Sequence, residues 1–173
     1  MLFRSAALQL VNACIKYGFA GVTLDFEEVP DDLQPAVITF SRILRAALAP
    51  GGRVLSSAIP VSTDAELARQ FASVNDYLFL MLYDEHYGRG DPGPIASQKW
   101  FEAKLDTFLT WIPARKVIVT LGAYGYEWND ADNKLNGSTV TFQDVMRPAK
   151  ENNATVKFDS TRSEEHTSEL QSH

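Results

Sequence analysis

The chain has 173 residues and a formal net charge of −6, and its composition is 45% hydrophobic and 22% charged. Such a composition is typical of a globular protein that can build an apolar core. The acidic balance gives no electrostatic footprint for nucleic acid or for an anionic membrane surface. No apolar run approaches the roughly 18 to 20 residues of a membrane span. We therefore expect neither a nucleic-acid partner nor a transmembrane segment.

Few residues are suited to metal or thiol chemistry. Cys14 is the single cysteine and falls on the apolar face of an expected helix, so we interpret it as a packing residue. Of the three histidines, His166 and His173 lie in the last twelve residues. His86 remains, and one histidine beside two acids is a weak metal site. We expect neither a metal nor a cofactor.

Two apolar patterns alternate along the chain, helical spacing and short β-prone runs. The patterns predict a helix over Leu2–Tyr17, a strand over Val22–Phe26, a helix over Leu33–Ala49, a strand over Arg53–Pro60, a short helix near Asp64–Ala72, a strand over Tyr77–Tyr83, a helix over Ser97–Ile112 and a strand over Lys116–Gly122. Apolar strands that alternate with helices are what a helix-covered parallel sheet requires. The sequence therefore predicts an α/β fold.

The pattern changes after Tyr124. Residues 127–136 are mostly polar, and a strand, a helix and a strand are expected over Thr139–Phe142, Gln143–Asn152 and Ala154–Phe158. We interpret residues 1–126 as one α/β domain and residues 127–161 as the start of an α+β insertion. Residues 162–173 resemble a translated sequencing-adapter read, so we expect a non-native tail, with a real polar disordered tail as the alternative.

Two acids share one face at the end of the first expected strand. Side chains alternate along a strand, so Thr23, Asp25 and Glu27 point to the same side. Two carboxylates that project together from an apolar strand raise each other's affinity for a proton, which suits Glu27 to general acid catalysis. The alternative is a solvated strand end whose acids cap the next helix, and the spacing alone does not decide between the two.

The acid pair lies in the first of four segments that resemble consecutive strands of one known family. Ala20–Glu27 resembles the D-G-x-D-x-D-x-E motif on the fourth strand of family 18 glycoside hydrolases, the chitinases and their relatives. Ala20 and Thr23 replace the first two acids of that motif. Ser57–Pro60, Met81–Asp84 and Val117–Tyr126 are similar to the fifth, sixth and seventh strands of the family's barrel.

Two further segments, Tyr83–Tyr87 and Pro92–Ser97, look closest to a bacterial branch of the family. That branch includes spore-cortex enzymes and barrels fused to a glycosyltransferase or a polysaccharide deacetylase. The resemblance implies that residues 1–126 form an incomplete catalytic (β/α)8 TIM barrel of about strands 4 to 7, since a complete barrel needs roughly 250 residues. It also implies an extracellular or cell-envelope location. We expect the piece alone to be inactive, because an open barrel leaves two sheet edges unpaired.

The resemblance also implies a reaction, the substrate-assisted retaining hydrolysis of β-linked N-acetylglucosamine polymers of the chitin or peptidoglycan type. Glu27 then protonates the glycosidic oxygen, and the acetamido group of the substrate acts as the nucleophile. Asp25 hydrogen-bonds the acetamido N–H, Tyr83 positions the acetamido carbonyl, and Asp84 orients Glu27 or the distorted sugar. A non-catalytic chitinase-like carbohydrate-binding barrel is the alternative, although retention of these four residues favours the enzyme.

Candidate substrate-binding residues lie at the same ends of the expected strands. Apolar sugar faces stack on aromatic rings, which singles out several aromatic side chains beside one threonine and one methionine. The candidates are Thr23, Met81, Tyr87, Tyr124, Tyr126 and Trp128. Packing inside the barrel is the favoured alternative for Met81, and ordinary loop packing is the alternative for Tyr126 and Trp128.

Overall fold

The structure is a computed structural model that describes residues 2–131, 134–151, 153–160 and 164–167. The chain divides into two compact units. The first comprises Met1–Met81 with Asp106–Thr120, and the second comprises Leu82–Leu105 with Leu121–His173. No helix among the described residues is long and apolar enough to cross a membrane.

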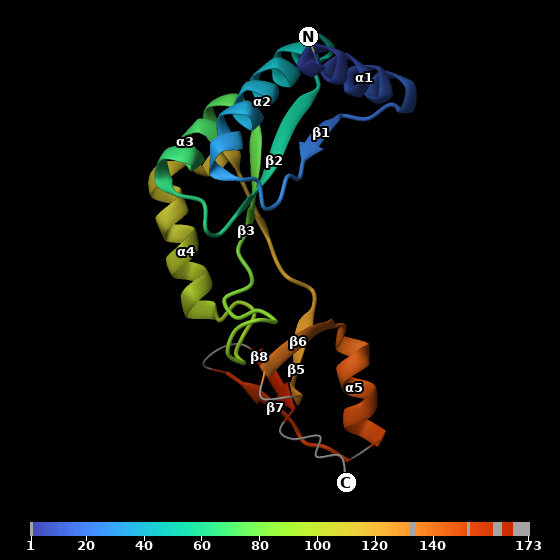
Figure 1. Cartoon of the computed structure of the whole chain (residues 1–173), viewed down its shortest axis with the longest axis vertical. Coiled ribbons are helices and arrows are strands. Elements are labelled where there is room, and N and C mark those ends of the chain that lie inside the picture. The colour runs from blue at the N-terminus through green and yellow to red at the C-terminus, as the bar shows by residue number, and fades with distance from the viewer. Residues whose placement is uncertain (1, 132–133, 152, 161–163, 168–173) are drawn as a thin grey trace. The chain divides into compact units, whose positions relative to one another are not determined.

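The first unit is built around a four-stranded parallel sheet (Figure 1). Its strands β1 to β4 are neighbours in chain order. They span Gly21–Leu24, Val54–Pro60, Tyr77–Met81 and Val117–Thr120. In the register of the sheet, Leu24 pairs with Ser57, and Met81 pairs with both Pro60 and Thr120. The α/β fold and the parallel sheet predicted from the sequence are confirmed, whereas closure of a barrel is not observed among the described strands.

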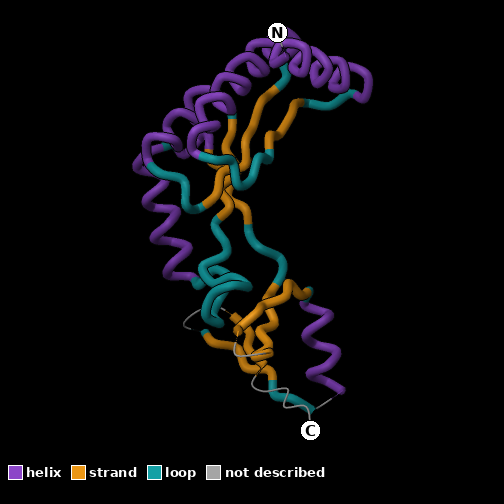
Figure 2. Tube along the Cα trace, viewed as in Figure 1, coloured by secondary structure: helices purple, strands orange, loops and turns teal. Residues whose placement is uncertain are grey.

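Helices precede β1 and connect these parallel strands, as the periodicity predicts. They are α1 (Leu2–Tyr17), α2 (Gln34–Leu48), α3 (Ala65–Val74) and α4 (Gln98–Trp111), with short 3-10 turns at Asp31–Leu33, Ala49–Gly51 and Ala114–Lys116. In the first unit, α1 contacts α2 and α2 contacts α3, so the three helices form one layer (Figure 2). Asp64 begins α3 by accepting a hydrogen bond from the backbone N–H of Leu67 at 2.8 Å.

The core of the first unit lies between the sheet and this helical layer. Leu24 and Leu55 of the sheet pack with Leu44 and Leu48 of α2, and all four side chains are buried. Cys14 on α1 joins this cluster and is 1% exposed, which confirms its interpretation as a packing residue. Burial of these aliphatic side chains holds α1 and α2 against the strands that precede the candidate site.

The second unit contains a loop over residues 82–97 and two antiparallel strand pairs. Strands β5 (Gly125–Ala131) and β6 (Lys134–Val140) form one hairpin, and α5 (Phe142–Glu151) follows. Strand β7 (Val156–Asp159) pairs with β8 (Glu164–Thr167), which lies inside the segment that we expected to be a non-native tail. The native or foreign origin of that segment stays a prediction, and residues 162, 163 and 168–173 of it lie outside the described residues.

The sequence pattern does not predict the hairpin of β5 and β6. A strand was expected only over Thr139–Phe142, and this range includes just the end of β6. No strand is predicted over residues 127–136, which are mostly polar, yet most of them form the two strands. A signal was present, because Tyr126 and Trp128 alternate with polar residues at the period of a strand.

Candidate functional site

Asp25 and Glu27 follow directly after β1, so they lie beyond the last residue that pairs with β2. The strand ends two residues earlier than expected. Both side chains are exposed, and in the described part of the chain neither carboxylate makes a hydrogen bond or an ion pair. Glu28 then adopts a φ of 51°, which turns the backbone away from the strand direction. Both acids are therefore available to a ligand.

Thr23 is bonded across the sheet. Its Oγ1 lies 2.8 Å from Oγ of Ser56, the residue that it pairs with on β2. The Ser56 hydroxyl also donates to the carbonyl oxygen of Val22 at 3.4 Å, so its single proton is used there and the Thr23 hydroxyl is left to donate to Ser56. This partner was not found from the sequence, and substrate binding by Thr23 stays a prediction.

Met81 is the last residue of β3 and is half-buried. It lies between Pro60 and Thr120 in the register of the sheet. The hydroxyl of Thr120 donates to the carbonyl oxygen of Leu80 at 2.6 Å, which ties β4 to β3 at this end. The position of Met81 is that of a residue packed within the sheet.

Asp84, in the second unit, accepts two hydrogen bonds from tyrosines. The hydroxyl of Tyr124 donates to its Oδ1 at 2.5 Å, and the hydroxyl of Tyr126 donates to the same oxygen at 3.1 Å. Burial raises the pKa of Tyr124 well above its ordinary value, and the adjacent Asp84 carboxylate raises it further. The pKa of Tyr126 is raised by the same causes. Both phenols therefore remain protonated donors at neutral pH, and they fix the orientation of Asp84.

The aromatic candidates of the second unit form a row of four rings. The ring centroids of Tyr83 and Tyr124 are 5.9 Å apart, those of Tyr124 and Tyr126 are 5.7 Å apart, and those of Tyr126 and Trp128 are 5.6 Å apart. The first two pairs meet edge to face, which is a preferred aromatic geometry. Tyr87 is exposed and belongs to none of these ring pairs. The structure thus brings together four of the predicted side chains and places Asp84 against two of them.

The loop over residues 82–97 is held by its own hydrogen bonds. The N–H of Glu85 donates to the carbonyl of Ile95 at 2.7 Å, and the Glu85 carboxylate accepts the N–H of Ser97 at 2.7 Å. Nδ1 of His86 lies 3.0 Å from the carbonyl oxygen of Asp91. His86 thus takes part in the loop itself, and no group of His, Cys, Asp and Glu side chains among the described residues could hold a metal ion.

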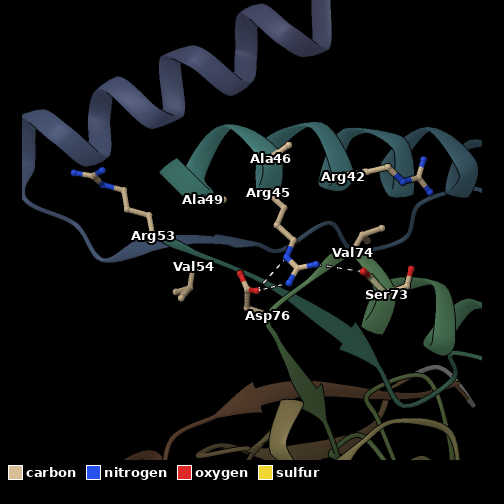
Figure 3. Close-up of a pocket in the computed structure, with 9 residues that line it drawn as sticks. All are labelled: Arg42, Arg45, Ala46, Ala49, Arg53, Val54, Ser73, Val74 and Asp76. Carbon is tan, nitrogen blue, oxygen red and sulfur yellow. Dashed lines mark hydrogen bonds and ion pairs between the residues drawn. The ribbon is translucent and has the colours of Figure 1, made fainter. Parts of the chain in front are cut away.

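A pocket of about 660 Å³ lies at the opposite end of the parallel sheet from the two acids (Figure 3). Arg45 pairs there with Asp76 at 2.8 Å, and the other oxygen of Asp76 accepts the N–H of Leu55 at 2.9 Å. Figure 3 shows Arg42 and Arg53 extending away from Arg45 in opposite directions. The three guanidinium groups do not converge on one ligand, so we assign these contacts to the stability of the sheet's N-terminal end.

Comparisons of the sequence with known proteins agree on one family. The family model described as glycosyl hydrolases family 18 matches residues 4–171. YdhD of Bacillus subtilis, named a sporulation-specific glycosylase, is 33% identical over 118 residues, which are 64% of this chain and 28% of that protein. The cortical fragment-lytic enzyme of Bacillus subtilis is 25% identical over 164 residues, which are 88% of this chain and 38% of that protein. The chain therefore spans about a third of the length of these relatives.

Solved structures give the same result for the fold. The structure of YdhD from Bacillus subtilis matches with a TM-score of 0.85 and 25% identity, covering 98% of this chain and 60% of that chain. A chitinase from Chromobacterium violaceum matches with a TM-score of 0.81 and 26% identity, covering 94% of this chain and 53% of that chain. Because the family model covers nearly all of the sequence and the folds agree, this chain belongs to the glycosyl hydrolases of family 18.

Proposed function

We propose that the protein containing this chain hydrolyses β-linked N-acetylglucosamine polymers by substrate-assisted retention, with Glu27 as the general acid. The observation that carries this proposal is the pair of exposed carboxylates of Asp25 and Glu27, directly after a parallel strand, in a chain of family 18. In α/β barrels the active site lies at the carboxyl ends of the strands. We further propose that β1 to β4 correspond to strands 4 to 7 of such a barrel.

The proposed reaction has two steps. In the first, Glu27 donates its proton to the glycosidic oxygen as the bond from that oxygen to C1 breaks, and the acetamido carbonyl oxygen of the substrate bonds to C1. Asp25 accepts a hydrogen bond from the acetamido N–H and offsets the developing positive charge. In the second, water adds to C1, Glu27 takes up the water proton, and the acetamido group is restored.

We assign positioning of the sugar to residues that follow β3 and β4. In this proposal Tyr83 directs the acetamido carbonyl, and Asp84 orients Glu27 or the distorted sugar. The two tyrosine hydroxyls on Asp84 support it, because a carboxylate held from two sides keeps a fixed direction. Tyr124, Tyr126 and Trp128 offer ring faces or edges to further sugars, and Thr23, Met81 and Tyr87 are weaker candidates for substrate contact.

The names of the relatives point to two polymers. A cortical fragment-lytic enzyme suggests spore-cortex peptidoglycan, and a chitinase suggests chitin. Both substrates carry the N-acetyl group that the proposed mechanism uses, so we propose an N-acetylglucosamine polymer. Fusion of this barrel to a glycosyltransferase or a polysaccharide deacetylase stays a prediction. The length of the complete gene would test it.

The test compares Glu27→Gln with Glu28→Gln in the full-length protein. Glu28 is the adjacent exposed acid and has no part in the proposed reaction, so it is a matched control. We expect Glu27→Gln to lower kcat on an N-acetylglucosamine pentamer by about 10²- to 10⁴-fold, the usual contribution of a general acid. Binding of the pentamer, followed by calorimetry, should persist.

The Glu28→Gln protein should keep the parent kcat. Unchanged turnover in Glu27→Gln would remove the catalytic assignment. A parent protein that binds the pentamer and never cleaves it would instead establish a carbohydrate-binding barrel without catalysis.

A further inference from the structure

The loop and the hairpin of the second unit meet at two glycines. The N–H of Gly137 on β6 donates to the carbonyl oxygen of Gly88 in the loop at 2.6 Å. A Cβ atom on Gly88 would overlap the carbonyl oxygen of Gly137, and a Cβ atom on Gly137 would lie 2.7 Å from Cα of Gly88. Both overlaps involve backbone atoms, so no side-chain rotation could relieve them. The Gly88–Gly137 contact therefore requires glycine on both sides.

Glycine is required at both positions because a side chain would not fit, and not because the backbone has a positive φ. Gly88 and Gly137 are not among the residues with positive φ. Two neighbouring glycines provide a contrast, because a Cβ atom on Gly90 or on Gly125 would meet its nearest neighbour at 3.6 Å, which is ordinary van der Waals contact. The loop and the hairpin thus each contain one glycine that is needed for the contact and one that is not.

The absence of side chains at the two glycines leaves room for the rings of Tyr126 and Trp128. Gly137 is the cross-strand partner of Trp128, so a side chain at position 137 would share a face with the indole. A Cβ atom there would lie 3.0 Å from Nε1 of Trp128, and one on Gly88 would lie 3.4 Å from Cε1 of Tyr126. Nε1 of Trp128 is buried and has no hydrogen-bond partner in the described part of the chain, which shows how closely its edge is covered.

The loop and the hairpin are also joined at a second point. The hydroxyl of Tyr126, on β5, donates to Asp84, which lies in the same loop as Gly88. One point of contact would allow the hairpin to pivot against the loop, whereas two separate points fix its direction. A shift at Gly88 therefore changes the position of Tyr126 and Trp128 relative to Asp84.

We propose that Gly88 and Gly137 are positioning residues that set where Tyr126 and Trp128 lie beside Asp84, and that they thereby determine the affinity for long N-acetylated oligosaccharides. The proposal rests on the proposed function, because it takes the two rings as the surface that binds sugars beyond the cleaved bond. Displaced rings bind these distal sugars less well, while the shorter hydrogen bond from Tyr124, at 2.5 Å, still holds Asp84 for bond cleavage. The effect should therefore appear in KM for long substrates and not in kcat.

The experiment uses Gly88→Ala and Gly137→Ala in the full-length protein, with Gly90→Ala and Gly125→Ala as matched controls. The substrates are an N-acetylglucosamine pentamer and a chromogenic disaccharide. Each of the first two variants should raise KM for the pentamer about tenfold, the scale of an overpacked contact, with kcat and the disaccharide kinetics unchanged. The double variant should lose less than the product of the two single losses, because both remove one contact. The controls should behave as the parent.

Two kinetic results would overturn the proposal. One is an equal KM for the pentamer in Gly88→Ala and Gly90→Ala. The other is a fall in kcat by the same factor for both substrates, which a general structural role would produce. Amide hydrogen exchange supplies a readout that needs no substrate, since the N–H of Gly137 should be protected in the parent and in Gly90→Ala and exposed in Gly88→Ala.

Exchange also separates this proposal from the proposed function. If the parent protein neither hydrolyses nor binds the pentamer, the proposed function and the link to oligosaccharide affinity are contradicted. A protected Gly137 amide in that protein would still establish the Gly88–Gly137 contact. An unprotected Gly137 amide in an active parent would contradict the contact alone. If Gly88→Ala does not fold, Gly137→Ala and exchange in the unaltered protein decide the question.

Discussion

The two compact units are stabilised by different kinds of contact. In the first unit, the side chains of Leu44, Leu48 and Leu55 are buried between a parallel sheet and its helices. In the second, only Leu82 and Ala149 among the described residues belong to the buried apolar core. Its structure depends instead on loop hydrogen bonds, a row of aromatic rings and two tyrosines on one carboxylate. Apolar burial is non-directional and hydrogen bonds are directional, so single atoms matter more in the second unit.

The largest expected effect on stability is in the first unit. Leu55→Ala removes a side chain that is fully buried on β2, and we expect the free energy of unfolding to fall by about 2 to 5 kcal/mol. Urea denaturation measures it, with Leu109→Ala as the control because that leucine is exposed on α4. Turnover per folded molecule should not change. Equal losses in the two variants would contradict the claim that burial stabilises this unit.

The next effect concerns the orientation of one carboxylate in the second unit. Asp84 has a φ of 63°, a conformation that asparagine tolerates, so Asp84→Asn keeps the backbone and removes the charge. We expect kcat/KM on the pentamer to fall about 100-fold, the cost of misplacing a reacting group by roughly 1 Å. The free energy of unfolding should fall less than in Leu55→Ala, because the amide oxygen of asparagine can still accept from both tyrosine hydroxyls. Asp91→Asn, which alters an exposed acid of the same loop, is the control, and equal activity of the two variants would exclude Asp84 from the site.

The smallest effect is on the pH dependence of stability. The pKa of Tyr124 is raised in the folded protein, whereas an unfolded tyrosine ionises near about pH 10. Above that pH the unfolded chain loses a proton that the folded chain keeps, so the contribution of Tyr124 is fully present below about pH 10 and is lost as the pH rises further. Tyr124→Phe should therefore show a shallower alkaline loss of stability in urea titrations between about pH 9 and 11. An alkaline slope in Tyr124→Phe equal to that of the parent would contradict the burial of this hydroxyl.

The elements of the first unit could be predicted from the sequence because their apolar periodicity is strong. Helix α1 was expected over Leu2–Tyr17, and the structure has the same bounds. The end of β1 was predicted two residues too late, because apolar character continues to Phe26 while pairing with β2 stops at Leu24. Periodicity reports which side chains suit a strand, and it does not report where the partner strand ends.

The candidate site was predicted less completely than the fold. Tyr83 was named from the family resemblance, and the other rings of the aromatic row from their position at the end of a strand. Nothing in the sequence indicated that Tyr124 and Tyr126 would bond the same oxygen of Asp84. The hairpin was missed because its strands are mostly polar and because it contacts the loop through Gly88 and Gly137, which have no side chains. Contacts between segments that are distant in the sequence leave no local periodic pattern for such reasoning to detect.

The path of the backbone limits how this protein can be divided. The chain passes from one unit to the other after Met81, after Leu105 and after Thr120. A module attached by one linker can be excised with a single cut, whereas three cuts are needed here. Two of them fall directly after β3 and β4, and the third severs α4. Transplanting the second unit into another protein would therefore require a scaffold that connects to it at three points.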